Sequence, residues 1–230
     1  MKHNLKQLHG YTLAATDGTI GQVKDFYFDA HSWAIRYLVV DTGSWLTGRL
    51  VLISPHAFGP INEDKETFAV KLSKNQIEQS PSFDAANPVS REFETNYYTY
   101  YGYPTYWSGG GLWGMSGYPS LPQETVPSDG RMDFVHPNDP DLRSAKAVTD
   151  FDIESMDGPL GHVTDFKVDD RSWAISDIVV ESGHWYHGKE VLIAPSQVDR
   201  ISFEDSKVFV RLTKEDISKT TEHNVVHAGV

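Results

Sequence analysis

Hydrophobic residues in this chain recur mainly at every second position, which is the spacing of β-strands. Residues 33–40 (WAIRYLVV) are rich in aromatic and β-branched side chains on both alternating faces, as is typical of a strand covered on both sides. Phe68, Val70 and Leu72 alternate strictly, so their strand should bury one face. The pattern therefore predicts an all-β chain of short strands.

Turn-forming and helix-capping residues lie between these runs. The dipeptide Asp17-Gly18 suits a tight hairpin, and residues 29–32 (DAHS) form a connection rich in turn formers. Ser73 followed by Gln76 resembles a helix N-terminal capping arrangement. We therefore expect a meander of strands that ends in a short helix.

The same pattern returns once along the chain. Residues 17–26 (DGTIGQVKDF) recur as residues 157–166 (DGPLGHVTDF), an offset of 157 − 17 = 140 positions. The match continues without a gap through residues 32–35 and 172–175 (both SWAI), 39–40 and 179–180 (both VV), and 51–55 and 191–195 (VLISP and VLIAP). Ungapped agreement of this length indicates an internal repeat, whose unit of roughly 70 residues is large enough for one small hydrophobic core.

The repeat divides the chain into four segments: a first repeat at 1–80, a linker rich in aromatic residues, Gly and Pro at 81–144, a second repeat at 145–220 and a tail at 221–230. The linker contains the run 97–107 (YYTYYGYPTYW), whose aromatic density argues against plain disorder. Its rings either pack over the repeats and join them, or form a surface for a partner or for self-association. Stacking on single-stranded nucleic acid is a third interpretation, weakened because no basic residue lies among the rings.

Exposed aromatic side chains are the expected contacts for a partner. Trp45 and Trp185 each lie near the tip of a predicted hairpin between two glycines, and Trp is enriched among residues that dominate binding energy. Packing of each Trp against the other repeat or the linker is an equal alternative. The full candidate set for partner binding is Trp45, Trp185, Tyr101, Tyr103, Tyr106, Trp107 and Trp113.

Two histidines offer a candidate metal site on the second hairpin. His184 and His187, with Glu181 and Glu190 nearby, are ligand types that zinc or copper accepts. The first repeat has no histidine at the equivalent positions, which favours a solvated polar loop. We therefore expect no bound metal and no cofactor.

Four aspartates recur at equivalent positions of the two repeats. Asp25 and Asp29 return as Asp165 and Asp169, and carboxylates held close together can perform acid–base chemistry. Their strand and turn positions instead favour a structural role, in which Asp accepts hydrogen bonds from backbone N–H groups. The sequence contains no other candidate catalytic set, and we expect no enzymatic activity.

Two glycines recur near the start of each repeat. Gly21 and Gly161 lie where a strand begins, and no Gly-rich loop with a following Lys-Ser or Lys-Thr accompanies them. We expect them to mark β-bulges and not to bind phosphate.

The composition narrows the classes of partner. A formal net charge of −12 opposes binding to phosphate backbones and anionic lipid headgroups, so we expect neither nucleic acid binding nor direct membrane insertion. The absence of cysteine excludes disulfides, thiolate nucleophiles and cysteine-ligated metals. The first residues form no apolar signal-peptide core, and the chain has no run of about 18 apolar residues. We expect a cytoplasmic protein.

Several of these features together resemble the PRC-barrel family, the compact β-barrel shared by the cytoplasmic part of the photosynthetic reaction centre H subunit and by ribosome maturation factors. They are the Asp-Gly-x-x-Gly-x-Val-x-Asp opening at residues 17 and 157, the aspartate that ends the next strand, the Val-Val pair and the Val-Leu-Ile-x-Pro strand. Two tandem copies with a Trp-containing hairpin look like a bacterial subgroup labelled by similarity to the H subunit.

The resemblance implies two tandem PRC-type β-barrels, each ending in a short helix, and a fold used for protein–protein interaction. We therefore expect a non-catalytic interaction or assembly module that binds an unidentified protein partner or itself. One alternative is a role like that of the reaction centre H subunit, assisting electron transfer at a membrane. The other is metal binding by His184 and His187.

Overall fold

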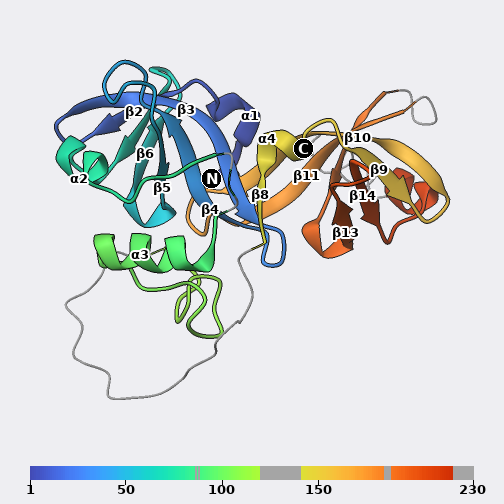
Figure 1. Ribbon diagram of the computed structural model, residues 1–230. Coiled ribbons are helices and arrows are strands. Elements are labelled where there is room, and N and C mark those ends of the chain that lie inside the picture. Colours follow the sequence, from blue (N-terminus) through green and yellow to red (C-terminus); the bar gives the residue numbers. More distant parts are fainter. Residues whose placement is uncertain (86, 88, 120–140, 184–187, 220–230) are drawn as a thin grey trace. The chain divides into compact units, whose positions relative to one another are not determined.

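Two compact units make up the chain in the computed structural model, which describes residues 1–85, 87, 89–119, 141–183 and 188–219 (Figure 1). Unit 1 contains Met1, the described residues of Gln7–Ser144, and Asp170–Ala174. Unit 2 contains Lys2–Lys6, Ala145–Asp169 and the described residues from Ile175 onward. The described part of the predicted linker therefore belongs with the first repeat.

The fold is mostly β, as the sequence predicts, and the described residues form two sheets of seven strands each. The sheet of unit 1 has the order β5-β4-β3-β2-β7-β6, with β8 paired to β3; β2 and β7 are parallel and the other neighbours antiparallel. Its strands are β2 (Thr12–Ala15), β3 (Gly18–Asp29), β4 (Ala34–Asp41), β5 (Leu50–Ile53), β6 (Phe58–Asn62), β7 (Thr67–Val70) and β8 (Leu142–Ser144).

The sheet of unit 2 has the corresponding order, β12-β11-β10-β9-β14-β13, with β1 paired to β10. Its strands are β1 (Lys2–Asn4), β9 (Asp152–Ser155), β10 (Gly158–Asp169), β11 (Ile175–Ser182), β12 (Glu190–Ile193), β13 (Val198–Ser202) and β14 (Lys207–Val210). Strands β1 and β8 lie 142 − 2 = 140 positions apart in the sequence. Strand β1 begins the first repeat but pairs with β10 of the second, whereas β8, the last three residues before the second repeat, pairs with β3 of the first.

The residues Asp170–Ala174, which precede β11, belong to unit 1. The Ile35 N–H donates to the Trp173 carbonyl at 2.8 Å, and the buried Trp173 ring packs edge-on against Phe58 and stacks on Phe68, with centroid distances of 4.5 and 5.6 Å. Trp173 adopts a left-handed backbone conformation (φ 55°), as does its repeat equivalent Trp33 (φ 54°). A residue of the second repeat thus completes the core of the first unit.

The prediction of closed barrels is wrong for the described residues. In unit 1 the terminal strands β5 and β6 pair on one side only, with β4 and β7 respectively. Between them lies the 3-10 helix η1 (Pro55–Ala57), and β6 itself contains Pro60, which has no N–H to donate to a neighbouring strand. The sheet therefore stays open at this point, and the same holds in unit 2 for β12 and β13, which pair only with β11 and β14.

A short helix closes each repeat, as predicted. In α2 (Lys74–Glu78), the Ser73 side chain accepts from the Gln76 N–H, and the Gln76 side chain accepts from the Ser73 N–H. Residues 214–219 are also helical, and Thr213 makes the corresponding bonds with Asp216. The other helices in the part of the chain that the structure describes are α1 (Leu5–Leu8), α3 (Arg91–Tyr101), α4 (Ala145–Val148) and the 3-10 helix η3 (Pro195–Gln197). No helix of the described residues has the length and apolar character needed to cross a membrane.

The two recurring glycines lie beside β-bulges, as predicted. The pairing of β2 with β3 shifts register next to Gly21, and that of β9 with β10 shifts next to Gly161. A Cβ atom on either residue would lie 2.0 Å from a backbone carbonyl oxygen, that of Asp41 or Glu181 respectively. Only glycine allows the backbones to approach this closely.

Candidate functional site

The most elaborate side-chain arrangement in the described residues surrounds α3, inside the predicted linker. Ser90 caps the helix by accepting from the Phe93 N–H at 3.1 Å, and Gly102 ends it in the left-handed conformation (φ 66°). We call residues 89–113 the aromatic segment. It lies on unit 1 over strands β4 and β5 (Figure 1).

Tyr97 attaches the helix to the edge of the sheet. Its ring packs edge-on against Tyr37 of β4 at a centroid distance of 5.3 Å. Its hydroxyl donates to the Leu52 carbonyl and accepts from the Ser54 N–H, both at 3.0 Å. Strand β5 is the last described strand of the sheet, so its outward backbone groups have no neighbouring strand to pair with. The Tyr97 hydroxyl supplies hydrogen bonds to two of these groups.

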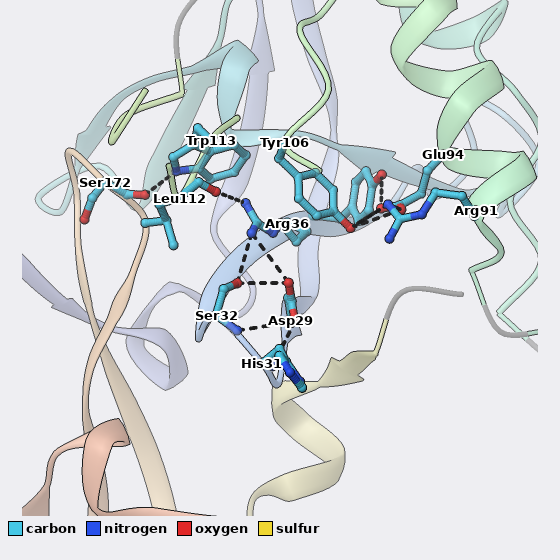
Figure 2. Close-up of polar contacts among 11 residues, drawn as sticks. Asp29, His31, Ser32, Arg36, Arg91, Glu94, Tyr106, Leu112, Trp113 and Ser172 are labelled. Carbon is cyan, nitrogen blue, oxygen red and sulfur yellow. Dashed lines mark hydrogen bonds and ion pairs between the residues drawn. The ribbon is translucent and has the colours of Figure 1, made fainter. Parts of the chain in front are cut away.

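Glu94 is the most unusual residue of the helix, because its carboxylate is fully buried. It accepts hydrogen bonds from the hydroxyls of Tyr37, at 2.8 Å, and Tyr106, at 2.9 Å, and it pairs with the Arg91 guanidinium at 2.6 Å (Figure 2). Burial raises the pKa of the Glu94 carboxyl to about 7, because desolvation outweighs the opposing effects of Arg91 and of the two hydroxyls. The group therefore titrates near neutral pH inside a protein core.

Arg36 of β4 is the second buried charge. Its guanidinium lies 3.8 Å from the centroid of the Tyr106 ring and 4.8 Å from that of Trp113, and it donates to the Leu112 carbonyl at 2.7 Å. It also donates to the Ser32 hydroxyl at 2.9 Å (Figure 2). Such stacking and hydrogen bonding compensate the cost of removing a guanidinium from water.

Asp29 organises the turn below Arg36. Its carboxylate accepts from the His31 N–H at 2.8 Å and from the Ser32 hydroxyl at 2.9 Å, and it lies 3.5 Å from the Arg36 guanidinium. Asp25 likewise accepts from the Phe26 N–H. The predicted structural role of these two aspartates is confirmed.

In unit 2, Asp165 behaves as Asp25 does in unit 1. It accepts from the N–H groups of Phe166, at 2.7 Å, and Lys6, at 2.9 Å. The structural prediction is therefore confirmed for Asp165 as well. Asp169 ends strand β10, where it pairs with Lys2 of β1.

The residues predicted to bind a partner fall into two groups. Tyr103, Tyr106 and Trp113 are buried in unit 1, and the Trp113 indole donates to the Ser172 carbonyl at 2.7 Å. These three rings pack over the sheet, as the first interpretation of the linker expects. A partner could reach them only if the aromatic segment moved.

The other group keeps exposed surface. Tyr101 and Trp107 are half-buried, and Trp45 is half-buried under the Lys74 ammonium, which lies 4.7 Å from the ring centroid. Partner binding by these three residues stays a prediction. Trp185 lies outside the described residues.

The candidate metal ligands are only partly described. His184 and His187 lie outside the described residues, whereas Glu181 and Glu190 face each other across β11 and β12. Among the residues that the structure describes, no group of three or more His, Cys, Asp or Glu side chains could hold a metal ion.

Sequence reasoning missed Arg36, Tyr37 and Glu94, the polar centre of the arrangement. A signal was present in the repeat itself: where β4 has Arg36 and Tyr37, the second repeat has Ser176 and Asp177. A pair of large side chains that appears in only one copy indicates a contact that only that copy makes.

The two units indeed differ on this face of the sheet. Leu52 of β5 is 2% exposed under the aromatic segment, whereas its equivalent Leu192 of β12 is 40% exposed. Ser54 is buried and its equivalent Ala194 is exposed. Within the described part of the chain, no side chain makes the bonds to Leu192 and Ala194 that Tyr97 makes in unit 1.

In the comparisons with known proteins, no protein-family model matches the chain, and no curated protein matches it either.

Proposed function

We propose that the chain is a non-catalytic protein–protein interaction or assembly module built from two related β-sheet units. One observation carries the proposal. In unit 1 the outer face of β4 and β5 binds an aromatic helix, whereas in unit 2 the equivalent residues Leu192 and Ala194 are exposed among the described residues. A sheet face that binds a helix of its own chain in one copy is suited to bind a helix of another protein in the other copy.

The resemblance to the PRC-barrel family supports the same proposal. Both repeats carry the Asp-Gly-x-x-Gly-x-Val-x-Asp opening, and its second glycine lies at a bulge in both sheets. The two sheets also have corresponding strand orders. If the chain is related to this family, protein–protein interaction is its expected function.

The charge of the chain favours a protein partner over other classes. A net charge of −12 repels nucleic acid and anionic lipid, whereas a basic protein surface would be attracted. The reaction-centre role rests on the resemblance alone, and the candidate metal ligands His184 and His187 lie outside the described residues.

Site-specific photo-crosslinking in the cells of origin tests the proposal. The photoreactive amino acid p-benzoylphenylalanine replaces Trp45, Trp107 or Leu192 in turn, and Met156, which is 73% exposed, serves as the control position. We expect an adduct of defined mass at one or more of the three test positions and none at the control. Absence of adducts at all three positions, together with a monomeric mass in light scattering, would overturn the proposed function.

A further inference from the structure

Unit 2 has a distinctive surface at the outer face and edge of β12. Its residues are equivalent, at an offset of 140 positions, to those that hold the aromatic segment in unit 1. The registers agree, because Val39 pairs with Leu52 in unit 1 and Val179 pairs with Leu192 in unit 2. The outer face of β11 and β12 consists of Asp177, Val179, Glu181, Glu190, Leu192 and Ala194. Val179 is buried and Asp177 half-buried, whereas the other four residues are exposed.

This surface has the properties of a docking site. Among the strands that the structure describes, β12 is the terminal one of its sheet and pairs only with β11. An open strand edge readily binds a further polypeptide segment. The Leu192 side chain is 40% exposed beside that edge, and Ala194 is exposed next to it. In unit 1 the same positions are closed by Tyr97, whose hydroxyl binds the Leu52 carbonyl and the Ser54 N–H.

The charges around β12 indicate a basic partner. Glu181 and Glu190 lie directly opposite each other on adjacent antiparallel strands, and both are exposed. Like charges in this arrangement destabilise the pair, so a cation from a partner would stabilise it. His162, 4.0 Å from Glu181, is a neighbouring group that is cationic only when protonated.

The same charges argue against a second copy of this chain as the occupant. In unit 1 the Glu94 carboxylate of α3 meets the Tyr37 hydroxyl, but unit 2 has Asp177 at the position of Tyr37. An α3 helix from another copy would bring Glu94 towards an aspartate that is already ion-paired with Lys2 at 2.8 Å. The net charge of −12 opposes self-association further.

We propose that the β12 face of unit 2 binds a short, basic amphipathic helix of a partner protein. A tyrosine of that helix bridges the Leu192 carbonyl and the Ala194 N–H, as Tyr97 does in unit 1, and its Lys or Arg side chains pair with Glu181 and Glu190. The inference rests on the proposed function, because it names the site and the kind of partner of the same module.

A modified α3 peptide is the probe. It comprises residues 90–102, stapled between positions 92 and 96, whose side chains face water in α3. It carries Glu94→Lys, which faces the position of Asp177, and Tyr101→Lys, one turn after Tyr97 on the side of the helix that contacts the sheet. The staple is needed because isolated helices of this length are marginal in water. The peptide is titrated into the full-length protein, and amide chemical shifts and fluorescence anisotropy are recorded. We expect saturable binding with shifts centred on Leu192 and Ala194.

Matched variants distinguish binding at the β12 face from non-specific charge attraction. In the protein, Leu192→Asp, and separately Glu181→Lys with Glu190→Lys, should each weaken binding by about tenfold or more, whereas Met156→Asp should leave it unchanged. In the peptide, Tyr97→Phe and restoration of Glu94 should each weaken binding.

The proposed site is refuted if the shifts lie elsewhere or if Leu192→Asp binds the peptide as the wild type does. The proposed function would still stand in that case if crosslinked adducts formed at Trp45 or Trp107. Adducts at none of the test positions would instead contradict the proposed function itself. The two failures are therefore distinguishable.

Discussion

The Tyr37 hydroxyl donates a hydrogen bond of 2.8 Å to the Glu94 carboxylate, and neither side chain is exposed to water. One residue belongs to a central strand of the sheet and the other to the helix that covers it. The attachment of the aromatic segment to unit 1 therefore includes a buried group whose pKa is about 7. Such a contact makes stability depend on pH in a range where ordinary carboxylates do not titrate.

The first prediction is that unit 1 loses stability as the pH rises from 5 to 8. The pKa of Glu94 is higher in the folded state, about 7, than its ordinary value of 4.5, so the folded state binds more protons between these values. The stabilisation that unit 1 gains from the protonated Glu94 carboxyl is complete below pH 4.5. It falls as the pH rises towards 7 and is absent above that value. The difference of 2.5 units corresponds to about 3 kcal/mol at most.

Urea unfolding followed by tryptophan fluorescence at several pH values measures this dependence. The matched control is Glu94→Gln, which keeps the shape but cannot ionise. Burial raises the pKa values of Tyr37, Tyr98 and Tyr106 around Glu94 above their ordinary value of 10, so these hydroxyls do not titrate between pH 5 and 8. The difference between the two profiles therefore isolates Glu94. Parallel profiles for the wild type and Glu94→Gln would contradict the prediction.

A second prediction concerns the hydroxyl of Tyr97. Tyr97→Phe removes the bridge between the Leu52 carbonyl and the Ser54 N–H, so we expect a loss of about 1–3 kcal/mol in the free energy of unfolding. Native-state hydrogen exchange should show a faster Ser54 amide, approaching the rate of Ala194. Tyr118→Phe, at a side chain that is 57% exposed, is the control and should change neither quantity.

The third prediction tests the contribution of the second repeat to unit 1. Trp173→Ala should destabilise unit 1 by about 3–5 kcal/mol, because the indole is buried against Phe58 and Phe68. Hydrogen exchange of the β4 and β7 amides reports the loss. Its repeat equivalent Trp33 is only half-buried, so Trp33→Ala should cost less. Equal effects of the two substitutions on unit 1 would show that the packing described for Trp173 is incorrect.

A fourth prediction follows from the bulge glycines. Gly21→Ala places a Cβ atom 2.0 Å from the Asp41 carbonyl oxygen, where only backbone could yield, so we expect a loss of about 3 kcal/mol or more, or failure to fold. Gly110→Ala is the control, because a Cβ there meets nothing within 4 Å. Thermal unfolding by circular dichroism compares the two. A Gly21→Ala variant as stable as the wild type would disprove the close approach.

Much of the local structure was predictable from the sequence. The two-residue alternation identified the strands, the Ser73 and Gln76 spacing identified the helix cap, and the recurring Gly21 identified a bulge. Each of these features depends on residues close in the chain, whose conformational preferences act before any tertiary contact forms.

The arrangement around α3 was predictable only in part. The aromatic density of residues 97–107 indicated packing or binding, but nothing local to Glu94 shows that it is buried. A glutamate on a helix is ordinarily solvated, and here Tyr37 and Tyr106, from a distant strand and a later loop, supply the hydroxyls that allow burial.

By itself, then, the sequence determined the mostly β character of this protein and several of its turns and helix caps, because side-chain periodicity and turn chemistry are local properties. Only the tertiary structure decided which segment covers each face. Strand β1 joins the sheet of the second repeat, β8 joins that of the first, and α3 covers β4 and β5. These packing arrangements depend on complementary shape and charge between residues tens of positions apart. Local sequence patterns give no information about such complementarity.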